Sequence, residues 1–132
     1  MINVVAGIVT YKGKILITQR SSKKEHSLKW EFPGGKVNSK ETKTDALTRE
    51  IKEELSIDIK KYNFLLDYIY EYDVSKKVHL HFYKIEDYRG NIKNIEHNKF
   101  IWTSLKDLKN FDFLDGDRMI IDRITNFNIL KL

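Results

Sequence analysis

The sequence predicts a single α+β domain over residues 1–132. Runs of β-prone and alternating residues in the first two thirds of the chain predict several strands, and apolar spacing of 3.6 residues predicts two helices. A chain of 132 residues can bury most of its apolar surface in one core. No linker or internal repeat divides it, so we expect one domain.

Near the N-terminus, residues 3–11 and 14–19 are expected to form two strands. Both runs are rich in β-branched residues, and Lys12-Gly13 between them is a hairpin signal. Residues 30–32 are expected to form a short strand that runs into a turn at Pro33-Gly34-Gly35. The two glycines would leave bare backbone there, able to touch a metal or a phosphate.

The centre of the chain is expected to form two half-buried strands linked around residues 75–77. Apolar or aromatic residues alternate with others in both: Phe64, Leu66, Tyr68, Tyr70 and Tyr72, then Val78, Leu80 and Phe82. A turn at residues 87–91 and a short strand at residues 100–103 are expected to follow.

Two helices complete the expected fold. Leu47, Ile51 and Leu55 form an apolar stripe, so the first helix has a buried face. The last helix is expected to start at Asp115, a candidate N-cap, and to bury the apolar side chains spaced along it: Ile120, Ile124, Phe127 and Leu130.

Three glutamates border the apolar stripe of the first helix. Glu50, Glu53 and Glu54 are spaced i, i+3 and i+4, so they share one side of the helix. Carboxylates this close repel unless a cation or a proton joins them. Oxygen ligands favour Mg²⁺ or Mn²⁺ over zinc. The alternative is a solvated helix face, which glutamates also commonly form.

Arg49 lies next to Glu50, and Glu41 precedes it by about two turns. Pairing with Arg49 could hold these carboxylates in fixed rotamers. A structural salt bridge is the simpler alternative.

The segment from Gly35 to Ile57 matches all but one position of the Nudix pattern, and the chain resembles a Nudix hydrolase. Glu31-Phe32-Pro33-Gly34-Gly35-Lys36 resembles the MutT-type branch of that family. The resemblance implies an α/β/α sandwich with a mixed β-sheet between helices. It also implies metal-dependent attack of water on a nucleoside triphosphate, giving a nucleoside monophosphate and pyrophosphate.

The resemblance assigns roles to residues by motif position. Glu50, Glu53, Glu54 and the Gly35 carbonyl would bind the metal, and Arg49 and Glu41 would support them. A loop glutamate before a Trp-containing strand, here Glu96 before Trp102, would bind a metal or deprotonate the attacking water. Glu53 is its rival for the role of base, and taken alone Glu96 is an ordinary exposed acid.

The one departure from the pattern is Ser56, which stands where the family has glycine after the helix. That position often takes a left-handed conformation, at a cost of about 1 to 2 kcal/mol for a non-glycine residue. Ser56 should therefore be strained or end the helix in another way.

Four residues are candidates for substrate binding. By resemblance, Arg20 would contact phosphate, whereas Phe32 and Asp117 would line the base pocket. Lys77 in the central hairpin is a weaker candidate. The simpler alternatives are a surface arginine for Arg20 and, for Asp117, an acid that the helix dipole favours in the first turn.

His79 and His81 lie on one face of an expected strand, where an i, i+2 pair could bind zinc. Zinc sites need three or four ligands, and the sequence shows no third one. We therefore expect an ordinary strand face.

The amino-acid composition limits the expected location and partners of the protein. Cysteine is absent, which excludes disulfides and thiol chemistry, and no signal peptide or membrane span is evident, so a cytoplasmic location is expected. The net charge of +5 suits a polyanionic nucleotide. Scattered lysine pairs without aromatic stacking residues argue against a nucleic-acid polymer as partner. A monomer or homodimer is expected.

The leading hypothesis is a Mg²⁺-dependent nucleoside triphosphate pyrophosphohydrolase that acts on oxidised guanine nucleotides such as 8-oxo-dGTP, or on CTP. A second hypothesis keeps the chemistry but changes the substrate to ADP-ribose, a dinucleoside polyphosphate or a sugar nucleotide. A third is a nucleotide-sensing domain without hydrolysis.

Overall fold

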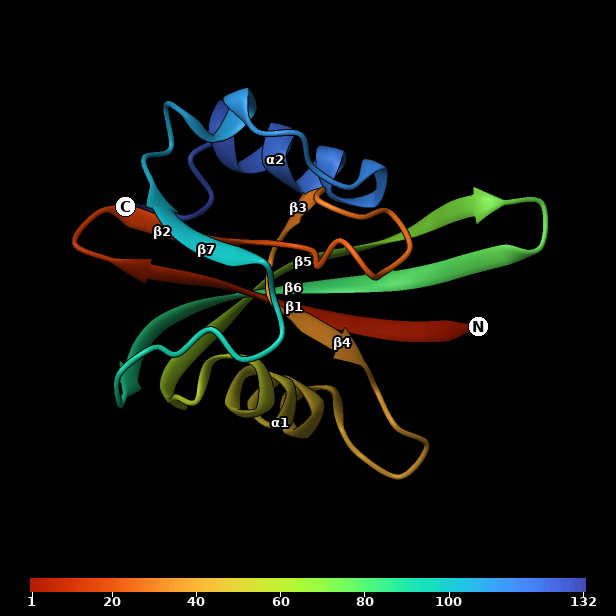
Figure 1. Cartoon of the computed structure of the whole chain (residues 1–132), viewed down its shortest axis with the longest axis horizontal. Coiled ribbons are helices and arrows are strands. Elements are labelled where there is room, and N and C mark those ends of the chain that lie inside the picture. The colour runs from red at the N-terminus through yellow and green to blue at the C-terminus, as the bar shows by residue number, and fades with distance from the viewer.

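The computed structural model describes all residues, 1–132. A seven-stranded sheet lies between two helices, α1 (Lys43–Leu55) on one face and α2 (Arg118–Asn126) on the other (Figure 1). This arrangement confirms the expected α/β/α sandwich.

The sheet is mixed because of the pairing of β1 (Ile2–Tyr11) at its centre. This strand is parallel to β6 (Lys76–Arg89) and antiparallel to both β2 (Lys14–Gln19) and β4 (Gly34–Lys36). The turn between β1 and β2 uses positive φ angles at Lys12 and Gly13, as the hairpin signal predicted.

The turn expected at Pro33-Gly34-Gly35 is only partly correct. β3 (Trp30–Glu31) ends just before it, but Gly34 already belongs to β4 and pairs with Ala6 of β1. A Cβ on Gly34 would lie 2.0 Å from the Val5 carbonyl oxygen, and neither glycine has a positive φ. Gly34 therefore permits a close approach of β4 to β1, and neither glycine serves to reverse the chain.

The central hairpin of β5 (Asp58–Asp73) and β6 is confirmed but longer than expected. Apart from Ile59, the first residues of β5 are largely polar and exposed on an edge strand, so they show no hydrophobic alternation. The turn expected at residues 87–91 begins late, because β6 continues to Arg89 and the chain bends at Gly90, where φ is 106°. The strand expected at residues 100–103 is confirmed as β7 (Lys99–Thr103), which begins one residue earlier and pairs with β2.

The expected start of the last helix was wrong. Two short 3₁₀ helices, η1 (Leu108–Asn110) and η2 (Asp115–Asp117), precede α2. Asp115 is not the N-cap of α2, because Asp117 holds that position, and the Asp115 carboxylate instead accepts a hydrogen bond from Arg118 Nε at 3.1 Å. Phe127 lies past the helix end and is 65% exposed, whereas Leu130 is buried.

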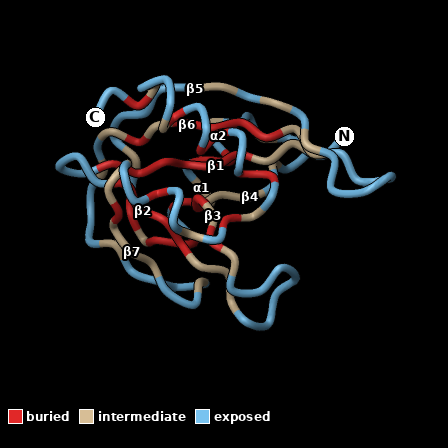
Figure 2. The backbone as a smooth tube through the Cα atoms, turned by 90° about the horizontal axis from the view of Figure 1, so that it is seen from above, coloured by how far each residue is buried: buried red, intermediate tan, exposed pale blue.

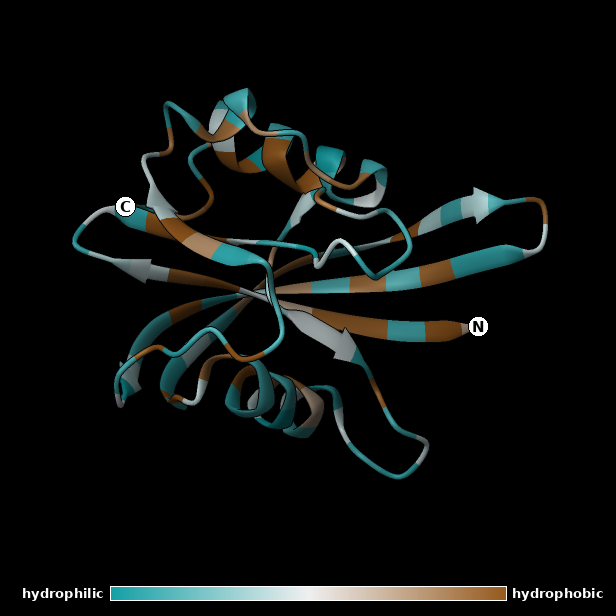
Figure 3. Cartoon of the chain, in the orientation of Figure 1, coloured by the Kyte–Doolittle hydropathy of each residue, from teal (hydrophilic) through white to brown (hydrophobic).

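Two hydrophobic clusters hold the layers together, one on each face of the sheet. The predicted stripe of α1, formed by Leu47, Ile51 and Leu55, packs against one face, and α2 covers the other. Figure 2 shows burial concentrated in the central strands, and Figure 3 shows hydrophobic and hydrophilic bands alternating along the β5–β6 hairpin. No helix is long and apolar enough to cross a membrane.

Candidate functional site

Helix α1 is held at both ends by local contacts that set where its glutamates lie. The Thr42 hydroxyl accepts a hydrogen bond from the Asp45 backbone N–H at 3.1 Å and caps the first turn. At the other end Ser56 has φ 61° and ψ 32°, and its N–H donates to the Lys52 carbonyl. Of the two alternatives that the sequence left open, Ser56 thus takes the strained left-handed conformation.

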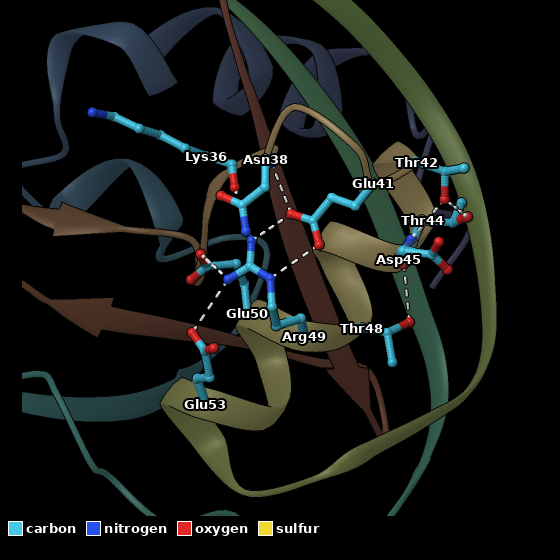
Figure 4. A network of polar contacts seen from close by, with 10 residues as sticks. All are labelled: Lys36, Asn38, Glu41, Thr42, Thr44, Asp45, Thr48, Arg49, Glu50 and Glu53. Atoms are coloured by element: carbon cyan, nitrogen blue, oxygen red, sulfur yellow. Dashed lines mark hydrogen bonds and ion pairs between the residues drawn. The ribbon is translucent and has the colours of Figure 1, made fainter.

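The guanidinium of Arg49 joins three of the predicted site carboxylates (Figure 4). Its Nε and Nη2 donate to the two oxygens of Glu41, at 3.1 and 2.6 Å. Its Nη1 donates to Glu50 at 2.9 Å and to Glu53 at 3.4 Å. Nη2 also donates to the Lys36 carbonyl at 3.0 Å, which ties the cluster to β4.

This arrangement fixes charge as well as position. The hydrogen bonds from Arg49 and from the Asn38 N–H lower the pKa of Glu41, so this carboxylate stays ionised. Hydrogen bonds to Glu41 raise the pKa of Arg49, so the guanidinium keeps its charge. The predicted supporting roles of Arg49 and Glu41 therefore have a physical basis in a two-point, charge-assisted contact.

Gly35 provides the opposite wall of the cluster. A Cβ at this position would lie 2.4 to 2.6 Å from the carboxyl atoms of Glu50, so any larger residue would push that carboxylate out of its present place. Glu50 is thereby held against the backbone of β4, and its side chain is only 16% exposed. The motif glycine thus brings main-chain groups and a carboxylate into one place.

Glu54 lies on the inner side of the cluster and contacts a residue that the sequence analysis missed. His97 Nε2 lies 3.1 Å from Glu54 Oε1 and 3.5 Å from Glu31 Oε2, and the His97 side chain is 4% exposed. Burial raises the pKa of Glu54 to about 7. Burial disfavours the imidazolium of His97, but the hydrogen bonds to Glu31 and Glu54 outweigh it and raise the pKa of His97 to about 9. A proton therefore stays between these side chains near neutral pH.

Little in the sequence marked His97. It is a single histidine in a polar loop, and its only signal is its place beside Glu96. Its Nδ1 is buried and has no hydrogen-bond partner.

The two candidates for the base are both open to solvent. Glu53 is 51% exposed and is held only by the longer contact with Arg49. Glu96 is exposed in the loop before β7, next to His97, and forms no hydrogen bond or ion pair. Their roles stay predictions, and both can reach a water molecule.

The donor set fits a hard divalent cation such as Mg²⁺. Glu50 and Glu54 are close enough to hydrogen-bond when one is protonated, and Glu53 extends the acidic edge towards solvent. The close fit of Glu50 against Gly35 places this carboxylate beside the β4 backbone, which also carries the Gly35 carbonyl. All these donors are oxygens, which Mg²⁺ and Mn²⁺ prefer.

A cavity of about 350 Å³ adjoins the cluster. Its wall includes Gly35 and three of the four predicted substrate residues, Arg20, Phe32 and Asp117. Arg20 Nη1 donates to Glu31 Oε1 at 2.9 Å, so Arg20, Glu31, His97 and Glu54 form one chain of contacts from the cavity to the acidic cluster. Phe32 packs against Phe82 and Phe113.

Asp117 lies at the inner wall of this cavity and is 7% exposed. Burial, and then the charge of Glu31, raise its pKa to about 8, so at neutral pH the carboxyl group is largely protonated and can both donate and accept a hydrogen bond. Lys77 is exposed, and its neighbour Lys76 lines the cavity in its place.

Comparisons with known proteins agree with this geometry. A model of the NUDIX domain matches residues 1–124. A Buchnera aphidicola (Schizaphis graminum) protein named 8-oxo-dGTP diphosphatase is 40% identical over 129 residues, covering 98% of this chain and 97% of that protein. An Escherichia coli CTP pyrophosphohydrolase is 32% identical over 123 residues, covering 92% and 90%.

Solved structures give the same result. The solution structure of the E. coli ORF135 protein matches with a TM-score of 0.86 and 30% identity, over 97% of this chain and 91% of that one. MutT, from a structural study of the Aliivibrio salmonicida and Vibrio cholerae proteins, matches with a TM-score of 0.80 and 27% identity, over 94% and 96%. The motif, the sandwich and these similarities agree: the chain belongs to the Nudix hydrolase family.

Proposed function

We propose that this protein hydrolyses nucleoside triphosphates to a nucleoside monophosphate and pyrophosphate, with Mg²⁺ as cofactor and Mn²⁺ as a substitute. 8-oxo-dGTP is the first candidate substrate and CTP the second, since relatives across nearly the whole chain carry these names. The observation that carries the proposal is the carboxylate cluster fixed by Arg49 against Gly35, directly beside a nucleotide-sized cavity.

Glu50, Glu53, Glu54 and the Gly35 carbonyl are the groups that would hold the ion. When bound, the ion supplies neutralisation of phosphate charge and a more acidic water. Arg49 keeps the carboxylates in place throughout, because its guanidinium is bonded to Glu41, Glu50 and the Lys36 carbonyl at once.

The cavity residues orient the nucleotide. Phe32 and Leu80 give the base an apolar wall, and Arg20 and Lys76 add positive charge to the cavity wall for the phosphates. Glu53 or Glu96 then takes the proton from the attacking water, since both are exposed, Glu53 at the edge of the cluster and Glu96 next to His97, which contacts Glu54. Lys77, a neighbour of Lys76, stays a weaker predicted contact.

Asp117 supports recognition of the base. In its acid form it donates one hydrogen bond and accepts another, which matches an edge with one acceptor and one donor side by side. The O6 and N7–H of 8-oxoguanine form such a pair, as do the N3 and N4 amino group of cytosine. On its N7 edge unmodified guanine offers two acceptors, N7 and O6, so Asp117 distinguishes 8-oxoguanine from guanine if the base presents that edge.

The test is release of pyrophosphate and monophosphate by purified protein with Mg²⁺, over a panel of 8-oxo-dGTP, dGTP, CTP, ATP and ADP-ribose. We expect turnover of 8-oxo-dGTP or CTP to exceed that of the other nucleotides. Hydrolysis of ADP-ribose alone would favour the second hypothesis, and no turnover of any triphosphate would refute the proposal.

Glu53→Gln and Glu96→Gln separate an enzyme from a nucleotide sensor and the two candidate bases from each other. We expect one of them to abolish turnover while nucleotide binding persists. If both variants keep full activity, neither glutamate is the base. The expected cytoplasmic location and the monomeric or homodimeric state stay predictions.

A further inference from the structure

The β5–β6 hairpin brings a carboxylate to the two histidines that the sequence left without a third ligand. Asp67 of β5 pairs with His81 of β6, and Ile69 pairs with His79. His79 Nε2 and Asp67 Oδ2 are 2.6 Å apart, and the imidazole rings of His79 and His81 lie with their centroids 4.0 Å apart. One ligand atom from each of these three residues lies within 4.8 Å of the other two.

From this geometry we propose that Asp67, His79 and His81 form a second divalent-metal site that takes Zn²⁺ or a similar borderline ion, separate from the carboxylate cluster on α1. Two imidazoles and one carboxylate are the ligand set of many zinc sites, with water in the fourth position. An ion about 2 Å from each ligand atom needs those atoms roughly 3.4 Å apart, so rotamer shifts of about 1 Å would close the site.

The surroundings of His81 favour a ligand role. Its Nε2 lies 3.0 Å from the side-chain oxygen of Asn3, and in the tautomer in which Nε2–H donates there, Nδ1 carries the lone pair that a metal requires. Metal-binding histidines commonly have their second ring nitrogen held in this way. His81 is 4% exposed, which restricts its ring to one orientation.

The other two ligands leave room for an ion to enter. The His79 side chain is 29% exposed and that of Asp67 is 44% exposed. Lys43, the first residue of α1, places a positive charge that acts on both Asp67 and His81. This charge opposes the binding of a metal ion between them. Because two of the three ligands are imidazole nitrogens, the site favours an ion that binds imidazole strongly and disfavours Mg²⁺.

The test is calorimetric titration of the protein with Zn²⁺ in a large excess of Mg²⁺, which occupies carboxylate-only sites. We expect one zinc equivalent, with affinity at least about tenfold weaker in His79→Gln and in Asp67→Asn. His26→Gln is the matched control, since this exposed histidine lies outside the cluster, and it should bind zinc as the wild type does.

Glu50→Gln separates this proposal from the proposed function. The inactive variant should keep the zinc equivalent, and wild-type protein should show zinc-dependent shifts of the His79 and His81 imidazole signals in NMR spectra. Zinc binding that survives in both His79→Gln and Asp67→Asn, or that disappears in Glu50→Gln, would overturn the second site. These two variants change partly exposed side chains, so the test does not depend on replacing the buried His81.

Discussion

Ser56 shows what one departure from a motif costs. Its left-handed backbone at φ 61° ends α1 as a glycine would, but its Cβ makes that conformation unfavourable. Ser56→Gly should raise the free energy of unfolding by about 1 kcal/mol, after the greater entropy of glycine in the unfolded chain is subtracted. Urea unfolding measures the gain. Ser56→Ala, which keeps the Cβ, should not give it, and an equal gain in both variants would contradict strain as the cause.

Asp117 makes stability depend on pH. Its pKa is about 8 in the folded protein and 3.8 in the unfolded chain, so between these values only the folded state holds the proton. Its stabilising contribution is complete below pH 4 and is lost as the pH rises towards 8, by at most about 1.4 kcal/mol per pH unit.

Asp117→Asn removes this titration while keeping a donor and an acceptor. Relative to wild type, the variant should therefore become progressively more stable from pH 4 to pH 8. Thermal unfolding of both proteins across this range checks it, and a difference that does not change with pH would contradict a protonated Asp117.

Single residues also show which contacts could be predicted from the sequence and which could not. The glutamates of α1, Arg49 and Gly35 were predicted because a fixed local spacing carries them. His97 and Asp67 were not, since each meets its partners only through the register of distant strands and loops. His97 reaches Glu54 across 43 positions of the chain, and Asp67 reaches His79 across the hairpin. Contacts of this kind leave no periodic signal.

At the scale of the element, α1 works as a platform whose acidic edge depends on Arg49. Arg49→Lys keeps the charge but loses the planar fork that bonds both oxygens of Glu41 while reaching Glu50. We expect kcat to fall roughly 10- to 100-fold with a small change in KM for the nucleotide, as for residues that orient metal ligands.

The matched control is Arg118→Lys at the start of α2, where an exposed arginine pairs with Asp112 and Asp115. Surface pairs of this kind contribute little, so kcat should not change. Steady-state kinetics of the two variants decides the point. Equal losses in both, or none in Arg49→Lys, would contradict the positioning role.

Elements were predicted well where burial imposes a pattern. The alternating part of β5 and the stripe of α1 matched because one face of each is buried. β1 and β2 are buried on both faces, and their runs of β-branched residues and the Lys12-Gly13 hairpin signal predicted them. The polar beginning of β5 lies on a sheet edge, where hydrogen bonds to β6 alone define the strand. The start of α2 was missed because a 3₁₀ turn buries Asp117. Tertiary contacts outweighed the local helix signals there.

At the scale of the molecule, the sandwich brings chain-distant groups from both faces of the sheet together around its central strand. β1 pairs with both β4 and β6, so the Gly35 backbone, the acidic edge of α1 and the cavity wall meet around one strand. The loop before β7 adds His97, whose imidazole contacts Glu54. The net charge of +5 then favours approach of a polyphosphate despite the acidic cluster.

The central claim is that the carboxylates of α1 hold a divalent cation for hydrolysis, and titration of pyrophosphate release with Mg²⁺ tests it most directly. Wild-type turnover should be absent without a divalent ion and should saturate with Mg²⁺. Glu50→Gln should lower it by about a hundredfold or more at every Mg²⁺ concentration. Glu86→Gln, on β6 and away from the cluster, should behave as wild type. Activity that needs no divalent ion, or a Glu50→Gln variant as active as wild type, would contradict the account.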